Sequence, residues 1–183
     1  KTLGIVGFGR IGRAVAKKVK GFEMNLIYYD VYRNEQAEKE LGVKYVDLET
    51  LLKVSDFVSL HVPLTKNTYH MIGEKELKMM KPTAYLINTA RGAVVDTEAL
   101  VKALKEKWIA GAALDVFEQE PVDPDNPLLK MDNVIATPHS ASYCDASFKR
   151  LFTSVGQEAA RVLSGHWPHN WVNKGVRPRK NLT

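Results

Sequence analysis

The chain has 183 residues, 45% of them hydrophobic, and a formal net charge of +5 at pH 7. This length suits one domain with a tail, and the composition suffices for a full core. No apolar run approaches the roughly 20 residues that a membrane span needs, and no signal-peptide pattern is present, so we expect no membrane partner. The single cysteine, Cys144, excludes an internal disulfide bond and favours a cytoplasmic location. The densest basic run, 174–180, is typical of a solvated tail, and we expect no nucleic-acid partner.

The first thirty residues carry the strongest local signal. An apolar strand at 3–6 is followed by a glycine-rich turn at 7–12, an amphipathic stretch, a second strand at 26–29 and the carboxylate of Asp30. Glycines let the backbone turn tightly and approach a pyrophosphate, and the helix that begins there offers unpaired N–H groups. A glycine turn alone also occurs in purely structural turns. The combination with a preceding strand and a following acid predicts a dinucleotide site.

Helices and strands continue to alternate along the chain. In order, we expect a helix at 36–41, strand 43–46, helix 48–53, strand 57–60, helix 73–80, strand 84–88, a helix capped by Asp96, strand 109–114 and strand 134–136. Continuous apolar strands, each followed by a helix, predict an α/β fold: a doubly wound parallel sheet with helices on both faces. A proline-rich loop at 118–133 interrupts the alternation. A long helical stretch is expected at 141–165, with Gly165 as its cap.

Polar residues follow the predicted strands, and parallel strands bring their carboxyl ends to one edge of the sheet. These residues are His61, Asn88, Thr89, Arg91, Asp115, Glu120 and His139.

A set of this kind suits hydride transfer to a carbonyl group, which also needs a proton donor. Histidine suits that task because its unperturbed pKa is about 6.5, and a carboxylate such as Glu120 can fix its tautomer. Arg91 can hold a carboxylate through two parallel hydrogen bonds. Taken singly, each residue has a plainer reading: His139 as a hydrogen-bonded loop histidine, Glu120 as an exposed acid, Asp115 as a turn cap. No His, Cys and Asp cluster has metal-ligand spacing, so we expect no metal.

Five motifs in this order and spacing resemble the NAD-binding domain of the D-isomer-specific 2-hydroxyacid dehydrogenases. They are Gly7-Phe8-Gly9-Arg10-Ile11-Gly12, His61-Val62-Pro63-Leu64-Thr65, Asn88-Thr89-Ala90-Arg91-Gly92, the stretch Leu114-Asp115-Val116-Phe117-Glu118-Gln119-Glu120-Pro121, and Thr137-Pro138-His139-Ser140-Ala141. The resemblance extends from Lys1 to about Asn173 and implies a Rossmann-type domain at 1–147, with a carboxy-terminal helix and tail at 148–183.

The resemblance also implies roles for individual residues. Arg91 would bind the substrate carboxylate, and Glu120 with His139 would form the acid/base pair. The implied NAD-binding residues are Gly7, Gly9, Arg10, Ile11, Gly12, Asp30, His61, Pro63, Thr89 and Asp115. Among them, Asp30 would bind the adenosine ribose and repel a 2′-phosphate, which favours NAD over NADP. Asp115 would hold the nicotinamide carboxamide. The implied activity is NAD-dependent interconversion of a small 2-hydroxy acid and its 2-oxo acid.

The family has a second domain, most of which precedes the glycine strand. Because the chain opens on that strand, we expect residues to be missing upstream, and we expect the chain alone to bind NAD but turn over slowly. The resemblance further implies a homodimer. The stretch Pro138–Tyr143 also resembles the carboxy-terminal binding proteins, NAD-sensing corepressors, and this alternative stays open, as does an NAD-binding module without catalysis. The identity of the 2-hydroxy acid also stays open.

Overall fold

A computed structural model describes residues 1–173, 175–177 and 182–183. The chain divides into two compact units, Lys1–Ala141 and Ser142–Thr183, and each is described by itself. Lys174, Arg179 and Lys180 of the basic run lie outside the described residues. The domain limits predicted from the sequence, 1–147 and 148–183, stay a prediction. No helix in the described part of the chain is long and apolar enough to cross a membrane.

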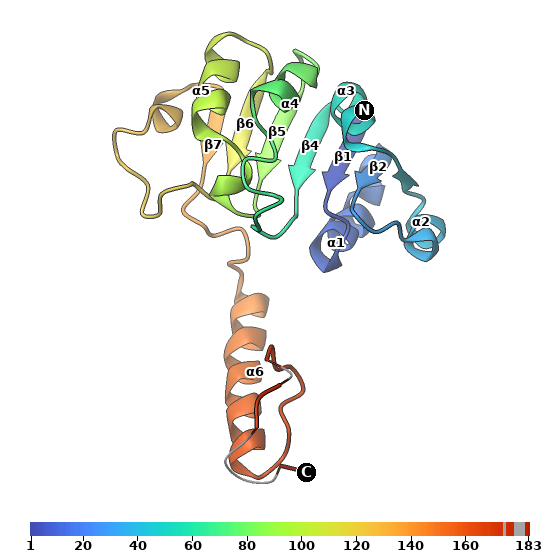
Figure 1. Ribbon diagram of the computed structural model, residues 1–183, viewed down its shortest axis with the longest axis vertical. Coiled ribbons are helices and arrows are strands. Elements are labelled where there is room, and N and C mark those ends of the chain that lie inside the picture. The colour runs from blue at the N-terminus through green and yellow to red at the C-terminus, as the bar shows by residue number, and fades with distance from the viewer. Residues whose placement is uncertain (174, 178–181) are drawn as a thin grey trace. The chain divides into compact units, whose positions relative to one another are not determined.

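A seven-stranded sheet with the order β3-β2-β1-β4-β5-β6-β7 forms the first unit (Figure 1). Its strands are β1 (Thr2–Val6), β2 (Asn25–Tyr29), β3 (Lys44–Tyr45), β4 (Phe57–Leu60), β5 (Tyr85–Asn88), β6 (Gly111–Leu114) and β7 (Val134–Ala136). Every pairing is parallel. The predicted doubly wound α/β fold is therefore confirmed, and all the strand carboxyl ends meet at one edge.

Helices cover both faces of the sheet. They are α1 (Arg10–Val19), α2 (Glu35–Leu41), α3 (Leu48–Val54), α4 (Glu74–Met79) and α5 (Thr97–Lys105). Buried residues of α1 and α2 share one core cluster with Leu3 and Ile5 of β1. Buried residues of α3, α4 and α5 belong to a second cluster, which contains Val6. Neighbouring residues of β1 thus serve opposite cores, as the two-residue period of a strand requires.

Local capping accounts for where several helices begin. The Asp96 side chain accepts a hydrogen bond from the N–H of Ala99 at 3.0 Å, which confirms the cap predicted for α5. The sequence reading missed three short 3₁₀ helices, η1 (Lys20–Phe22), η2 (Gly92–Val94) and η3 (Pro127–Lys130). The last of them lies inside the segment that was predicted to be loop.

The second unit contains one long helix, α6 (Asp145–Leu163), within its described residues. It begins at Asp145 rather than at Ala141, because Cys144 is extended and the N–H of Cys144 bonds to the Ser147 hydroxyl at 3.2 Å. At the other end, the N–H of Gly165 bonds to the carbonyl of Val162 at 3.0 Å and that of His166 to Arg161 at 3.1 Å. This is the Schellman arrangement expected of a helix that ends at a glycine.

Candidate active site

In the turn between β1 and α1, backbone atoms occupy space that a side chain would need. A Cβ at Gly12 would lie 2.2 Å from the carbonyl oxygen of Gly7, and Gly7 itself has a φ of +93°. A Cβ at Gly9 would meet nothing within 4 Å, so open space lies beside it. No side chain caps α1 at Gly9, so among the described residues the first amides of the helix have no side-chain acceptor at that cap. Open amides at a helix amino terminus attract anions such as a pyrophosphate.

Asp30 ends β2 beside this turn. Its Oδ2 accepts the N–H of Phe8 at 2.6 Å, and its Oδ1 accepts the N–H of Tyr32 at 3.2 Å. A cavity of about 410 Å³ lies here, lined by Gly7, Gly9, Tyr29, Asp30, Val31, His61, Val62, Pro63, Thr65, Asn67, Thr68 and Met71. Five of the residues predicted to bind the cofactor therefore meet in one cavity at the carboxyl ends of β1, β2 and β4. In α/β folds of this kind, the carboxyl ends of the strands beside the glycine turn are where a dinucleotide binds.

The other predicted cofactor residues lie along the same edge. Arg10 and Ile11 form the first turn of α1, where Ile11 is 65% exposed. Thr89 is exposed after β5, and Asp115 is buried after β6; neither belongs to the cavity that contains Asp30.

His61 is partly buried, and its Nε2 lies 2.9 Å from the Ser59 hydroxyl. Burial lowers the pKa of His61, because desolvation disfavours the charged imidazolium. A histidine that stays neutral at neutral pH suits a wall of the cavity, which agrees with the sequence reading.

His139 and Glu120 meet as the sequence predicted. His139 Nδ1 lies 2.8 Å from Glu120 Oε2, and Glu120 Oε1 accepts the N–H of Phe117 at 3.1 Å. The hydrogen bond to His139 lowers the pKa of the Glu120 carboxyl, aided by the Phe117 N–H and the charge of Arg91. Within the described residues, Nε2 of His139 has no partner. That nitrogen can therefore exchange a proton with a ligand while the carboxylate fixes the other one.

Asp115 holds the loop that carries His139. Its Oδ1 accepts the Thr137 hydroxyl at 2.5 Å and the N–H of Ser140 at 2.8 Å, and its Oδ2 accepts the N–H of Ala141 at 2.9 Å. Desolvation acts to raise the pKa of Asp115, but these hydrogen bonds outweigh it and the pKa lies below its usual value. The N–H of His139 also bonds to the Asp115 carbonyl at 2.8 Å. His139 adopts a φ of +53°, and these bonds hold it in that sparsely populated region.

Arg91 follows β5 at the same edge of the sheet. It is exposed, and its Nη1 donates to the Ala90 carbonyl at 2.6 Å. A Cβ on the next residue, Gly92, would lie 1.9 Å from the carbonyl carbon of Phe117. Only glycine permits this approach, which brings the segment after β5 against the segment that bears Glu120. The guanidinium is consequently close enough to contribute to the lowered pKa of Glu120.

A second cavity, of about 660 Å³, opens beside the acid/base pair. Its walls are Asp115, Phe117, Glu120, Pro121, Val122, Leu129, Ala136, Thr137, Pro138 and His139. A mainly apolar space with a few convergent polar groups is typical of a small-molecule site. No group of three or more His, Cys, Asp and Glu side chains in the described chain is arranged to hold a metal ion.

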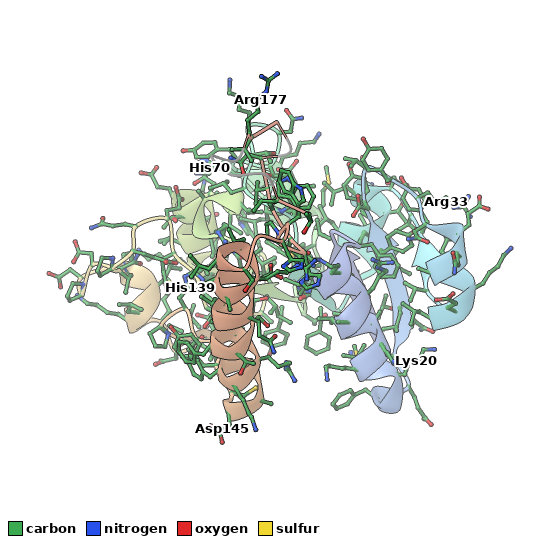
Figure 2. The ribbon with its side chains drawn as sticks, turned by 90° about the horizontal axis from the view of Figure 1, so that it is seen from below. Lys20, Arg33, His70, His139, Asp145 and Arg177 are labelled. Atoms are coloured by element: carbon green, nitrogen blue, oxygen red, sulfur yellow. The ribbon has the colours of Figure 1, made fainter. Side chains whose placement is uncertain are left out.

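Sequence reasoning missed the contacts that support this site. Glu118 Oε1 accepts the N–H of Thr97 at 2.9 Å, while its Oε2 lies 3.0 Å from His70 Nε2. His70 and His139, both labelled in Figure 2, thus contact carboxylates of the same short segment after β6. The only signal in the sequence was that Glu118 stands in the same motif as Glu120. Thr137, which bonds Asp115, likewise stands in the motif that contains His139.

Comparison with known proteins identifies relatives of this chain. A family model described as "D-isomer specific 2-hydroxyacid dehydrogenase, NAD binding domain" matches residues 1–141. The glyoxylate reductase of Korarchaeum cryptofilum is 60% identical over 176 residues, which are 96% of this chain and 53% of that protein.

Solved structures agree with this match. The D-isomer-specific 2-hydroxyacid dehydrogenase of Lactobacillus delbrueckii ssp. bulgaricus, in its NAD-complexed form, superposes with a TM-score of 0.86 at 41% identity, covering 94% of this chain and 56% of that one. The D-lactate dehydrogenase of Aquifex aeolicus, complexed with NAD and lactic acid, gives 0.81 at 44% identity, covering 90% and 54%. The chain therefore spans about half the length of the relatives it matches.

Proposed function

This chain belongs to the family of D-isomer-specific 2-hydroxyacid dehydrogenases, as an NAD-binding domain, and on that premise we propose that it serves an oxidoreductase acting on a small 2-hydroxy or 2-oxo acid. The observation that carries the proposal is the 2.8 Å contact between His139 Nδ1 and Glu120 Oε2 at the strand edge that bears the glycine turn. A nucleotide cradle and a histidine paired with a carboxylate are the two parts that carbonyl reduction needs.

The glycine turn and Asp30 would hold the coenzyme. The open amides at the start of α1 would receive the pyrophosphate, and Asp30 would accept hydrogen bonds from the adenosine ribose. When bound, NAD supplies the hydride-transfer chemistry. Asp115 has one lone-pair position on Oδ2 beyond its bond to Ala141, and this would accept the carboxamide N–H of the nicotinamide.

Arg91 would bind the substrate. Its planar guanidinium matches a carboxylate through two parallel N–H···O bonds, and it would also stabilise the negative charge that develops on the carbonyl oxygen. The charge of Arg91 reaches Glu120, the partner of His139, so a 2-oxo acid whose carboxylate Arg91 holds would have its carbonyl near His139.

His139 would supply the proton in reduction. Its Nε2–H would protonate the carbonyl oxygen as the carbonyl carbon gains a hydride, and the 2-hydroxy acid results. In oxidation Nε2 would take the hydroxyl proton back. Glu120 would hold the ring orientation and stabilise the imidazolium through a charge-assisted bond at Nδ1. General acid–base help of this kind contributes about 10²–10⁴ in rate.

Glyoxylate is the first substrate to test, because the relative from Korarchaeum cryptofilum is a glyoxylate reductase. The chain is first titrated with NADH, following the coenzyme's fluorescence, and then assayed for NADH oxidation with glyoxylate, hydroxypyruvate and pyruvate. His139→Gln is expected to retain NADH binding and to lower any rate with glyoxylate about 10²–10⁴-fold. His166→Gln, an exposed histidine of the second unit, is the matched control and is expected to change neither. Properly folded chain that binds no NADH would overturn the proposal.

A further inference from the structure

Arg33 is a basic residue next to the adenosine site whose guanidinium is already engaged. It follows Asp30 by three residues, and Figure 2 places it beside α2. Its Nε lies 2.9 Å from Glu38 Oε1 and its Nη2 lies 3.0 Å from Glu38 Oε2, a two-point contact. Its Nη1 is 3.9 Å from Glu35, and its Cζ stands 5.8 Å from the centre of the Tyr45 ring. All of these contacts direct the guanidinium toward α2 and β3.

The protein core fixes the partner of Arg33. Glu38 Oε1 accepts the hydroxyl of Tyr28 at 2.9 Å, and Tyr28 is completely buried. The N–H of Asn34, the residue that caps α2, in turn donates to the Tyr28 hydroxyl at 2.9 Å. The Glu38 side chain is only 14% exposed, and the bond from Arg33 lowers the pKa of its carboxyl. Glu38 is therefore an ionised and well-anchored acceptor.

The segment that carries Arg33 leaves directly from the ribose end of the coenzyme cavity. Tyr29, Asp30 and Val31 line that cavity, and the bond from the N–H of Tyr32 to Asp30 Oδ1 folds the chain back in a tight turn. In dinucleotide domains, an acid at this strand end binds the ribose 2′-hydroxyl, and a nearby arginine accommodates a 2′-phosphate where one is present. Arg33 follows Asp30 closely enough in the chain to supply such an arginine, but its Nε and Nη2 are bonded to Glu38.

We propose that Glu38 is a determinant of coenzyme choice: by holding Arg33 against α2, it withholds a guanidinium from the 2′-phosphate of NADP(H). Discrimination against NADP(H) then has two sources, repulsion by Asp30 and sequestration of Arg33 by Glu38. This goes beyond the proposed function, because it concerns which dinucleotide the domain accepts and not the reaction.

The expected effect is modest, because the Arg33 side chain is 56% exposed. Exposed ion pairs are weak, so releasing Arg33 should improve NADPH binding about two- to fivefold. NADH has no 2′-phosphate, and its affinity should not change.

The test measures dissociation constants of NADH and NADPH for the 183-residue chain by coenzyme fluorescence. Glu38→Gln keeps an oxygen that can accept the Tyr28 hydroxyl but weakens the hold on Arg33. We expect its NADPH dissociation constant to fall about two- to fivefold, with that of NADH unchanged. Glu35→Gln is the matched control, because it removes one charge from the same helix. The Glu35 carboxylate does not form the two-point contact with Arg33 and lies 3.9 Å from Arg33 Nη1. Circular dichroism and thermal melting verify that both variants fold.

Two further variants test whether the gain depends on Arg33, whereas Glu35→Gln tests the effect of net charge. Arg33→Ala combined with Glu38→Gln should lose the gain in NADPH affinity, and Arg33→Ala alone should leave NADPH binding unchanged because Arg33 is already withheld. The proposal is overturned if Glu35→Gln improves NADPH binding as much as Glu38→Gln, if the gain persists without Arg33, or if Arg33→Ala alone weakens NADPH binding severalfold. Absence of NADH binding by the parent chain would overturn the proposed function and this proposal together, whereas normal NADH binding without an NADPH gain in Glu38→Gln would overturn this proposal alone.

Discussion

Replacing Asp115 by asparagine is expected to destabilise the first unit by removing the anchor of the His139 loop. Asp115 is 5% exposed, and its two oxygens accept three hydrogen bonds, from Thr137, Ser140 and Ala141. Asparagine has nearly the same shape but only one acceptor oxygen. If that oxygen stays with Thr137 and Ser140, the new amide group faces the N–H of Ala141, and two donors then confront each other.

The magnitude follows from this count. One buried donor left without an acceptor costs about 1–3 kcal/mol, and the two remaining bonds lose the advantage of a charged acceptor, about 1 kcal/mol each. Partial relaxation of the loop reduces the sum, so we expect the free energy of unfolding to fall by about 2–4 kcal/mol at pH 7. The effect should depend on pH, because the folded pKa of Asp115 lies below its unfolded value of about 3.9. The stabilisation is complete above that value and is lost as the pH falls through the folded pKa, so the two proteins should converge in acid.

Urea denaturation followed by the fluorescence of Trp108 reports on the first unit, if Trp167 and Trp171 of the second unit are first replaced by phenylalanine. The matched control is Asp132→Asn, which alters an exposed carboxylate of the same unit and should change stability by less than about 0.5 kcal/mol. A difference between wild type and Asp115→Asn below about 0.5 kcal/mol at pH 7, or one that does not shrink below pH 4, would refute the reasoning.

Three further outcomes are expected from the same structure. Gly12→Ala forces a Cβ to within 2.2 Å of the Gly7 carbonyl oxygen and should weaken NADH binding at least about tenfold in a fluorescence titration. The control Gly21→Ala, where a Cβ meets nothing within 4 Å, should leave NADH binding unchanged. Equal effects of the two substitutions would contradict a role for the close approach of Gly12 to Gly7. Arg91→Ala should change the NADH dissociation constant by no more than about twofold, but the NADH complex should no longer bind oxamate, a 2-oxo-acid isostere, when binding is measured by calorimetry. Retained oxamate binding would exclude Arg91 as the site that holds the substrate carboxylate. Sedimentation should show that the parent chain is a dimer and that Ile135→Asp dissociates it, because the Ile135 side chain is 70% exposed on β7. The control Phe22→Asp, at a residue 75% exposed in η1, should leave the dimer intact. A monomeric parent chain would contradict the expected association.

The fold could be predicted from the sequence because its strands are short apolar runs between residues typical of turns. Strand β4, for example, is bounded by Ser55-Asp56 and Pro63, and β5 follows Pro82. The short helices η2 and η3 were not legible, because three or four residues are too few to show a helical period. The start of α6 was placed at Ala141 instead of Asp145 because Ser142 and Tyr143 do not by themselves stop a helix. The capping contacts of Cys144 and Ser147 decide that boundary.

The site was legible where topology alone brings residues together. Asp30, His61 and the glycine turn follow three neighbouring strands, so the parallel sheet places them at one cavity. The contact between Glu120 and His139 was also predicted, from the motifs that contain them. The hydrogen bonds by which Asp115 holds the segment 137–141 were not predicted. Two of their donors are backbone amides 25 and 26 residues away, and a backbone amide leaves no signature in the residue type. The capture of Arg33 by Glu38 was missed for a related reason, since a helix residue facing a loop residue has no fixed spacing.

The segment after β6 shows why an acidic stretch cannot be assigned from composition. Asp115, Glu118 and Glu120 would be interpreted from composition as a solvated acidic loop, yet each carboxylate makes specific contacts with other segments of the unit. Asp115 binds the segment 137–141, Glu118 binds the start of α5 together with His70, and Glu120 binds His139. Asp115 and Glu120 both contact the segment 137–141, while Glu118 ties the same stretch to His70 and to the start of α5. Contacts with separate segments fix the position of a loop better than the same number of contacts with one segment, because each segment removes a different direction of movement. The position of the His139 imidazole therefore depends on the whole stretch after β6, although Glu120 is the one of these three carboxylates that contacts the imidazole.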